Sequence, residues 1–81
     1  MSEERSYVYN PPEHWYIEYH YELPDGWIML REFHVKQKSI DSSIARLKSY
    51  LKKNGALQVE IYVYHRQNLD CGWMLMQAEK I

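Results

Sequence analysis

The sequence predicts one small α+β domain with the element order β-β-α-β-β, in which an amphipathic helix packs on one face of an antiparallel-rich, four-stranded sheet. Three observations predict it: apolar and polar residues alternate on both sides of Pro24-Asp25-Gly26, apolar residues recur at helical spacing after Ser39, and two further apolar stretches follow. The chain has 81 residues, enough for a single domain that buries a modest share of its surface. We expect residues 1–13 to form a partly flexible N-terminal arm of this domain.

Residues 14–36 are predicted to form a β-hairpin about Pro24-Asp25-Gly26. Proline presets the first turn position, and glycine supplies the left-handed residue of a type I turn with a bulge. The resulting register sets Glu18 opposite Glu32 and makes one hairpin face almost wholly apolar and aromatic. The other face carries Tyr16, Glu18, His20, Glu22, Ile28, Leu30, Glu32 and His34.

A helix is predicted to begin at Ser39, which can cap it, and to end at Asn54-Gly55. Asp41 falls in the first turn, where a negative charge meets the positive end of the helix. The apolar residues form one narrow stripe at i, i+4, i+7 and i+11, made of Ile40, Ile44, Leu47 and Leu51.

The third strand is predicted at about 56–66 and the fourth at about 71–79. The third strand alternates in polarity and lies either beside strand one, antiparallel to it, or beside strand two by a right-handed crossover. The fourth strand is apolar on both faces, which predicts a strand that is central or covered on both sides.

The core is expected between the helix and the apolar face of the hairpin, joined by the third strand. Its predicted members are Trp15, Ile17, Tyr19, Tyr21, Leu23, Trp27, Met29, Phe33, Val35, Ile40, Ile44, Leu47, Leu51, Val59, Ile61 and Val63. Arg31 is a charged residue on this otherwise apolar and aromatic face, and we expect its charged end to extend outwards into water.

Ten Lys and Arg residues nearly balance eleven Asp and Glu residues, which is not the basic excess typical of nucleic-acid binding proteins. The acids gather in residues 1–32 and the bases in residues 33–55. Cys71, alone in the chain, cannot form an internal disulfide, so we expect a cytoplasmic setting. The N-terminus has no apolar signal core and no run of residues is apolar enough to span a bilayer, so no membrane partner is predicted.

The best candidate site is a protein-binding surface on the outer side of the sheet, because tyrosine is enriched at interface cores. Its predicted residues are Tyr16, Glu18, His20, Leu30, Glu32, His34, Tyr62 and Tyr64. The predicted function is a small non-enzymatic protein-binding module, more specifically an inhibitor or regulator of a larger assembly that turns its acidic face towards a basic target. The same element order occurs in many small α+β adaptors, regulators and inhibitors of phage or mobile-element type, which is an analogy of fold only. We also expect a homodimer, formed through this face or through strand four.

Two alternatives stay open. A nucleic acid is the alternative partner, bound through the tyrosines or through a basic helix face made of Arg46, Lys48, Lys52 and Lys53. A metal ion is the third possibility, with His20, His34, Glu18 and Glu32 as its ligands. The sequence contains no catalytic constellation and predicts no cofactor. Cys71 is expected to be a partly buried structural thiol.

Overall fold

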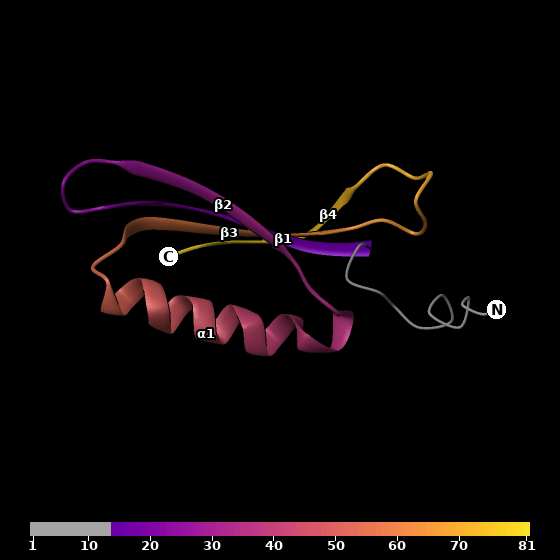
Figure 1. The fold of residues 1–81 in the computed structure, drawn as a ribbon, viewed down its shortest axis with the longest axis horizontal. Helices are drawn as coiled ribbons and strands as arrows, with labels where there is room; N and C mark the ends of the chain where they lie inside the picture. The colour runs from indigo at the N-terminus through magenta and orange to yellow at the C-terminus, as the bar shows by residue number, and fades with distance from the viewer. Residues whose placement is uncertain (1–13) are drawn as a thin grey trace.

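The computed structural model describes residues 14–81, so the predicted arm at residues 1–13 lies outside the described residues. The elements are β1 (Trp15–Glu22), β2 (Ile28–His34), the 3-10 turn η3 (Gln37–Ser39), α1 (Ile40–Lys53), β3 (Leu57–His65) and β4 (Met74–Lys80). The predicted α+β class and the order β-β-α-β-β are confirmed. Figure 1 shows the two layers, with the sheet above and α1 below.

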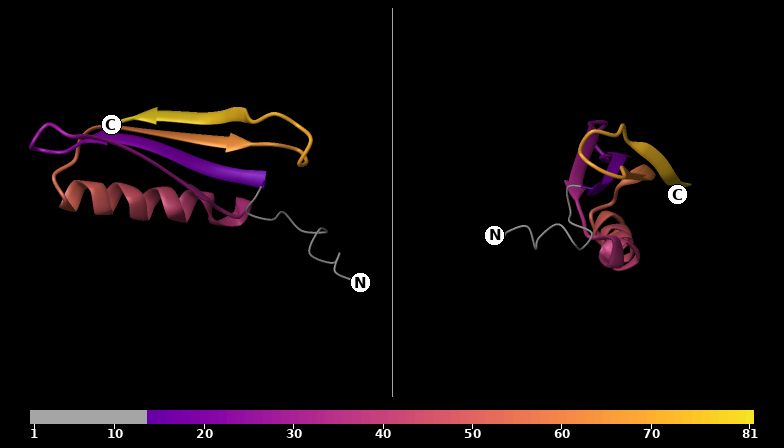
Figure 2. Two further views of the ribbon diagram at one scale, coloured as in Figure 1. Left: turned by 45° about the horizontal axis from the view of Figure 1, so that its top comes forward. Right: turned by 90° about the vertical axis from the view of Figure 1, so that its right-hand side faces the viewer.

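The four strands form one sheet in the order β2-β1-β3-β4, and every neighbouring pair is antiparallel. Of the two arrangements left open by the sequence, β3 therefore takes the place beside β1. Figure 2 shows β1, β3 and β4 side by side, with α1 beneath the sheet and β4 at one edge. The two central strands are β1 and β3, and the two edge strands are β2 and β4.

The hairpin has the predicted turn and the predicted register. The Gly26 N–H donates to the Leu23 carbonyl at 2.8 Å, and the Leu23 N–H donates to the Trp27 carbonyl at 2.8 Å. Gly26 has φ +97°, the left-handed conformation that the bulge requires. Glu18 faces Glu32 across the pair. The turn therefore places the side chains of both strands on the predicted faces of the hairpin.

The helix has the predicted ends. Ser39 occupies the N-cap position, although its hydroxyl makes no capping hydrogen bond. At the other end Gly55 has φ +73°, its N–H donates to the Lys52 carbonyl at 3.1 Å, and the Ala56 N–H donates to the Leu51 carbonyl at 2.9 Å. These two bonds form a Schellman motif, which turns the chain from α1 into β3.

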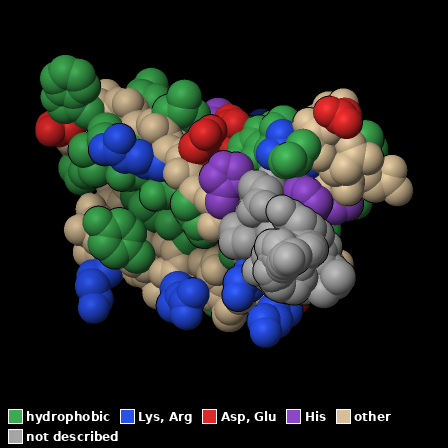
Figure 3. Space-filling view, turned by 45° about the vertical axis from the view of Figure 1, so that its right-hand side comes forward, with side chains coloured by type: hydrophobic (Ala, Val, Ile, Leu, Met, Phe, Trp, Pro, Cys, Tyr) green, Lys and Arg blue, Asp and Glu red, His purple; other side chains and the backbone are tan. Residues whose placement is uncertain are grey.

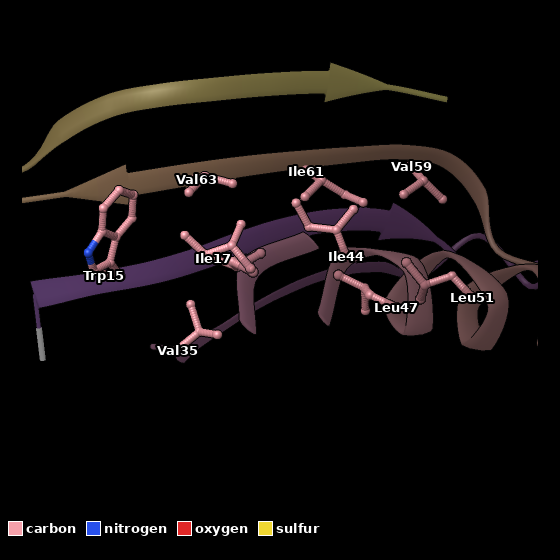
Figure 4. Packing of buried hydrophobic residues seen from close by; sticks show 10 residues of the cluster. Trp15, Ile17, Val35, Ile44, Leu47, Leu51, Val59, Ile61 and Val63 are labelled. Carbon is pink, nitrogen blue, oxygen red and sulfur yellow. The ribbon is translucent and has the colours of Figure 1, made fainter. Parts of the chain in front are cut away.

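The core lies between α1 and the two central strands, and Figure 4 shows its side chains pointing towards one another. Its buried apolar members are Trp15, Ile17, Val35, Ile40, Ile44, Leu47, Leu51, Val59, Ile61 and Val63. The predicted members Tyr19, Tyr21, Leu23, Met29 and Phe33 are only partly buried.

Two residues on the helix side of the hairpin are exposed. Trp27, predicted to be buried, is 69% exposed, because the tip of the hairpin extends past the end of α1 (Figure 1). Arg31 is exposed as expected, since its strand β2 lies at the edge of the sheet.

The prediction that the fourth strand is central or covered on both sides is wrong. β4 is an edge strand, and Met74, Leu75 and Met76 are 61%, 53% and 51% exposed. One helix is about 10 Å wide, whereas four strands about 4.8 Å apart make a wider sheet. α1 therefore covers the centre of the sheet and leaves β4 open.

Candidate functional site

The sheet face opposite α1, here called the outer face, carries all eight predicted protein-binding residues. The strand registers arrange them with Glu60 in three rows across β2, β1 and β3. The rows are His34–Tyr16–Tyr64, Glu32–Glu18–Tyr62 and Leu30–His20–Glu60. Within residues 14–81 no helix lies on this face. These residues therefore form one contiguous surface.

The first row is the core of an aromatic cluster. Tyr16 stacks on Tyr64 with ring centroids 4.8 Å apart and planes 15° apart, and the His34 ring lies 5.9 Å from Tyr16. Trp73 meets Tyr16 edge-on at 4.6 Å, and the Arg66 guanidinium lies 4.3 Å from the centre of a Trp73 ring. The cluster is thus preorganised by its own ring contacts.

Sequence analysis missed the contributions of Trp73 and Arg66. Both lie in the connection between β3 and β4, which folds over the end of the outer face and brings Trp73 onto Tyr16. The predicted strands at about 56–66 and 71–79 include both residues, whereas β3 ends at His65 and β4 begins at Met74. Periodicity gives no position for a side chain that lies in a loop. The only signal was the apolarity of Trp73 itself.

The other two rows hold a hydrogen-bonded acidic patch. His20 Nε2 lies 2.7 Å from Glu18 Oε2, and the Tyr62 hydroxyl donates to Glu60 at 2.5 Å. The Tyr62 hydrogen bond lowers the pKa of Glu60, and the same bond raises the pKa of Tyr62. Glu32 faces Glu18 across β1 and β2. Two of the three carboxylates, those of Glu18 and Glu60, are thus held by hydrogen bonds beside the aromatic cluster.

The chemistry of the outer face differs from that of a surface that binds single-stranded nucleic acid by stacking. Single-strand binding by stacking needs free ring faces and cations along the phosphate path. Here Tyr16 and Tyr64 already stack on each other, and the carboxylates of Glu18, Glu32 and Glu60 lie on the same face. A phosphate backbone laid across the outer face would meet these negative charges.

The four predicted metal ligands are divided between two parts of the outer face. Glu18 and His20 bond to each other, whereas His34 lies against Tyr16 in the aromatic cluster. In the described part of the chain, no three His, Cys, Asp or Glu side chains come together in a group that could hold a metal ion. The geometry adds no support to the metal hypothesis.

The predicted basic helix face consists of two separate flanks. Arg46 and Lys53 line a shallow hollow beside Tyr50. Lys48 and Lys52 line a different groove of about 430 Å³, whose other lining residues are Leu51, Ala56, Val59 and Ile81. Lys48 also forms an ion pair with Glu79 of β4. Figure 3 shows Lys and Arg side chains along the lower edge of the molecule, where α1 lies.

Cys71 is exposed, so the prediction of a partly buried thiol is wrong. The residue lies before β4, which begins at Met74, and its backbone N–H donates to the Asn68 carbonyl at 3.1 Å. A residue in this surface turn has no sheet neighbour to cover it.

Across residues 14–81, none of the helices has the length and apolarity needed to cross a bilayer. No protein-family model, curated protein or solved structure matches this chain.

Proposed function

We propose that this protein is a non-enzymatic binding module whose outer face docks on a cationic surface of a larger protein assembly, which it inhibits or regulates. One observation carries the proposal: a sheet face on which residues 14–81 place no helix combines a preorganised aromatic cluster with a hydrogen-bonded acidic patch. Inhibition of this kind needs only a surface that occludes or holds its target. The exposed free thiol of Cys71 favours a cytoplasmic setting, where thiols stay reduced.

The aromatic cluster supports high-affinity docking. Tyr and Trp are enriched among the residues that dominate interface energies, because they bury large areas. Tyr16 and Tyr64 hold each other by stacking, and Trp73 packs on Tyr16. These rings therefore lose little conformational entropy when a partner covers them.

The acidic patch supports the choice of a cationic partner. Glu18, Glu32 and Glu60 lie on the outer face, whereas the basic residues of α1 lie on the opposite side of the sheet. This separation gives the molecule an orientation in the field of a charged target, and electrostatic steering raises association rates. A complex of this kind associates more slowly as the salt concentration rises.

The first experiment places a photo-crosslinking residue at Leu30 on the outer face or at Ser49 on α1. In cells of the native host, we expect Leu30 adducts with one discrete protein and none with that protein from Ser49. The purified partner is then titrated by calorimetry with Glu32→Lys and with Asp41→Lys, which make the same charge change on the outer face and on α1. We expect Glu32→Lys to weaken binding about tenfold, and Asp41→Lys to leave it unchanged.

The proposal fails if Ser49 captures the same partner as efficiently as Leu30, or if both charge variants bind equally. It also fails if the Leu30 adduct is a nucleic acid.

A further inference from the structure

β4 combines the sequence of an interior strand with the position of an edge strand. The stretch Met74–Ala78 carries no charge, and its first three residues are more than half exposed. We propose that β4 pairs antiparallel with β4 of a second copy of this chain across a two-fold axis. The two four-stranded sheets then become one continuous sheet in which β4 is central.

The other edge of the sheet shows what a protected edge looks like in this molecule. β2 carries Arg31 and Glu32 in its middle, and both side chains are exposed. Charges in the middle of an edge strand discourage pairing with another chain. The charges of β4 lie only at its end, where Glu79 is drawn towards α1 by its ion pair with Lys48. Of the two edges, β4 is therefore the one suited to pairing.

The sequence of β4 complements itself. An axis at Ala78 sets a small residue against its own copy, Gln77 against Glu79, and Met76 against Lys80. No like charges face each other in this register, and Met76 can cover the aliphatic stem of Lys80. β4 pairs regularly with β3 from Gln77 to Lys80, and the irregularity in this pairing lies at Met76, between Leu75 and Gln77.

Apolar surface flanks this register at both ends. Beyond the Met76–Lys80 pair, Leu75 of each strand comes near Ile81 of the other, and Ile81 is 62% exposed. Ile81 also lines the groove between α1 and β3, so the exposed surface continues from the strand to the helix side of the sheet. A stable interface needs about 800 Å² from each partner, more than one strand edge provides, and the groove extends the available contact.

A dimer through the outer face is less favourable. A two-fold contact between two outer faces would bring the acidic patches, with Glu18 and Glu32, towards their own copies. Pairing through β4 about an axis perpendicular to the sheet instead leaves both outer faces open and on the same side. The dimer thus presents two copies of the candidate docking surface to one target.

The first test is a cysteine scan along β4 in a Cys71→Ser background. Residues directly opposite in an antiparallel pair have Cα atoms about 4.5–5.5 Å apart, which a disulfide can bridge. Each step away from the axis adds about 6.6 Å to the offset, along the strands, between a residue and its own copy. We expect Ala78→Cys to cross-link under mild oxidation, whereas Met74→Cys and Leu30→Cys should form no disulfide between copies.

A cross-linking maximum at any position from Met76 to Lys80 supports the pairing and locates the axis. A flat profile along β4, or equal cross-linking at Leu30 on β2, overturns it.

The second test measures the mass of the unmodified chain by size exclusion with light scattering. We expect a mass near twice 9.9 kDa at about 100 µM protein. Met76→Lys should give a monomer, because it sets two lysines against each other, and Leu30→Lys should remain a dimer as the matched change on the other edge. Circular dichroism checks that both variants are folded. A monomeric wild type, or a dimer broken by Leu30→Lys alone, overturns the proposal.

Glu32→Lys separates the two proposals, because it should weaken partner binding while leaving the dimer mass unchanged.

Discussion

Ile17→Val should lower the free energy of unfolding by about 1 kcal/mol. Ile17 is 0% exposed and lies on the central strand β1, where it packs into the core between the sheet and α1 (Figure 4). The substitution removes one methylene, worth about 0.8 kcal/mol in transfer free energy, and leaves a small cavity. With a urea dependence of about 1 kcal/mol per M for a small protein, the unfolding midpoint should fall by about 1 M.

The matched control is Ile28→Val, which removes the same group from the same sheet at a side chain that is 75% exposed. We expect its free energy of unfolding to stay within about 0.5 kcal/mol of wild type. Equilibrium unfolding in urea, followed by the fluorescence of buried Trp15, measures both variants. Repeating the titration at a tenfold lower protein concentration separates unfolding from dissociation. Equal midpoint shifts for the two variants would refute this assignment of the core.

Three further outcomes are expected. Gly55→Ala should cost about 1 kcal/mol of stability in urea unfolding because Gly55 has φ +73°, whereas Gly72→Ala should be nearly neutral, since no atom lies within 4 Å of the added Cβ. Tyr62→Phe should raise the pKa of Glu60 towards its ordinary value in an NMR titration, because the hydrogen bond that lowers it is lost. Burial and nearby carboxylates raise the pKa of Tyr16, so the unfolded chain loses this proton first. Stability should therefore fall as the pH rises through about 10 and on through the folded-state pKa, and Tyr16→Phe should reduce that loss in urea midpoints measured between pH 8 and pH 11.

The hairpin and the helix could be predicted because their signals are local. The turn around Gly26 fixes the register of β1 and β2, and that register alone places Glu18 opposite Glu32. Gly55 likewise marks the end of α1, since few other residues adopt its backbone conformation. Each prediction depended on residues close together in the sequence.

The position of β4 could not be predicted in the same way. The apolarity of Met74–Met76 indicates that these residues favour burial, but it does not say whether α1 is wide enough to cover them. Trp27 poses the same difficulty, because its exposure depends on how far the hairpin extends beyond α1. The exposure of Met74–Met76 and that of Trp27 both depend on the relative sizes and positions of the helix and the sheet.

The division of the basic residues of α1 between two flanks of the helix could have been predicted from the sequence. At about 100° per residue, Arg46 and Lys48 lie about 200° apart around the helix axis. Lys53 falls close to Arg46 and Lys52 close to Lys48, which gives the two flanks found in the structure. Angular positions, rather than the charge of the whole segment, would have distinguished these flanks.

The strand order also has a consequence for how the chain folds. On its two sides β1 pairs with β2, which follows after a short turn, and with β3, which follows only after α1; Tyr19, for example, faces both Arg31 and Ile61. Closing the longer loop costs more chain entropy, and a two-stranded hairpin alone is only marginally stable in water. We expect the hairpin to form early and reversibly. The slow step is then the arrival of β3 beside β1, so the folding rate should respond more strongly to changes in α1 than to changes in the hairpin turn.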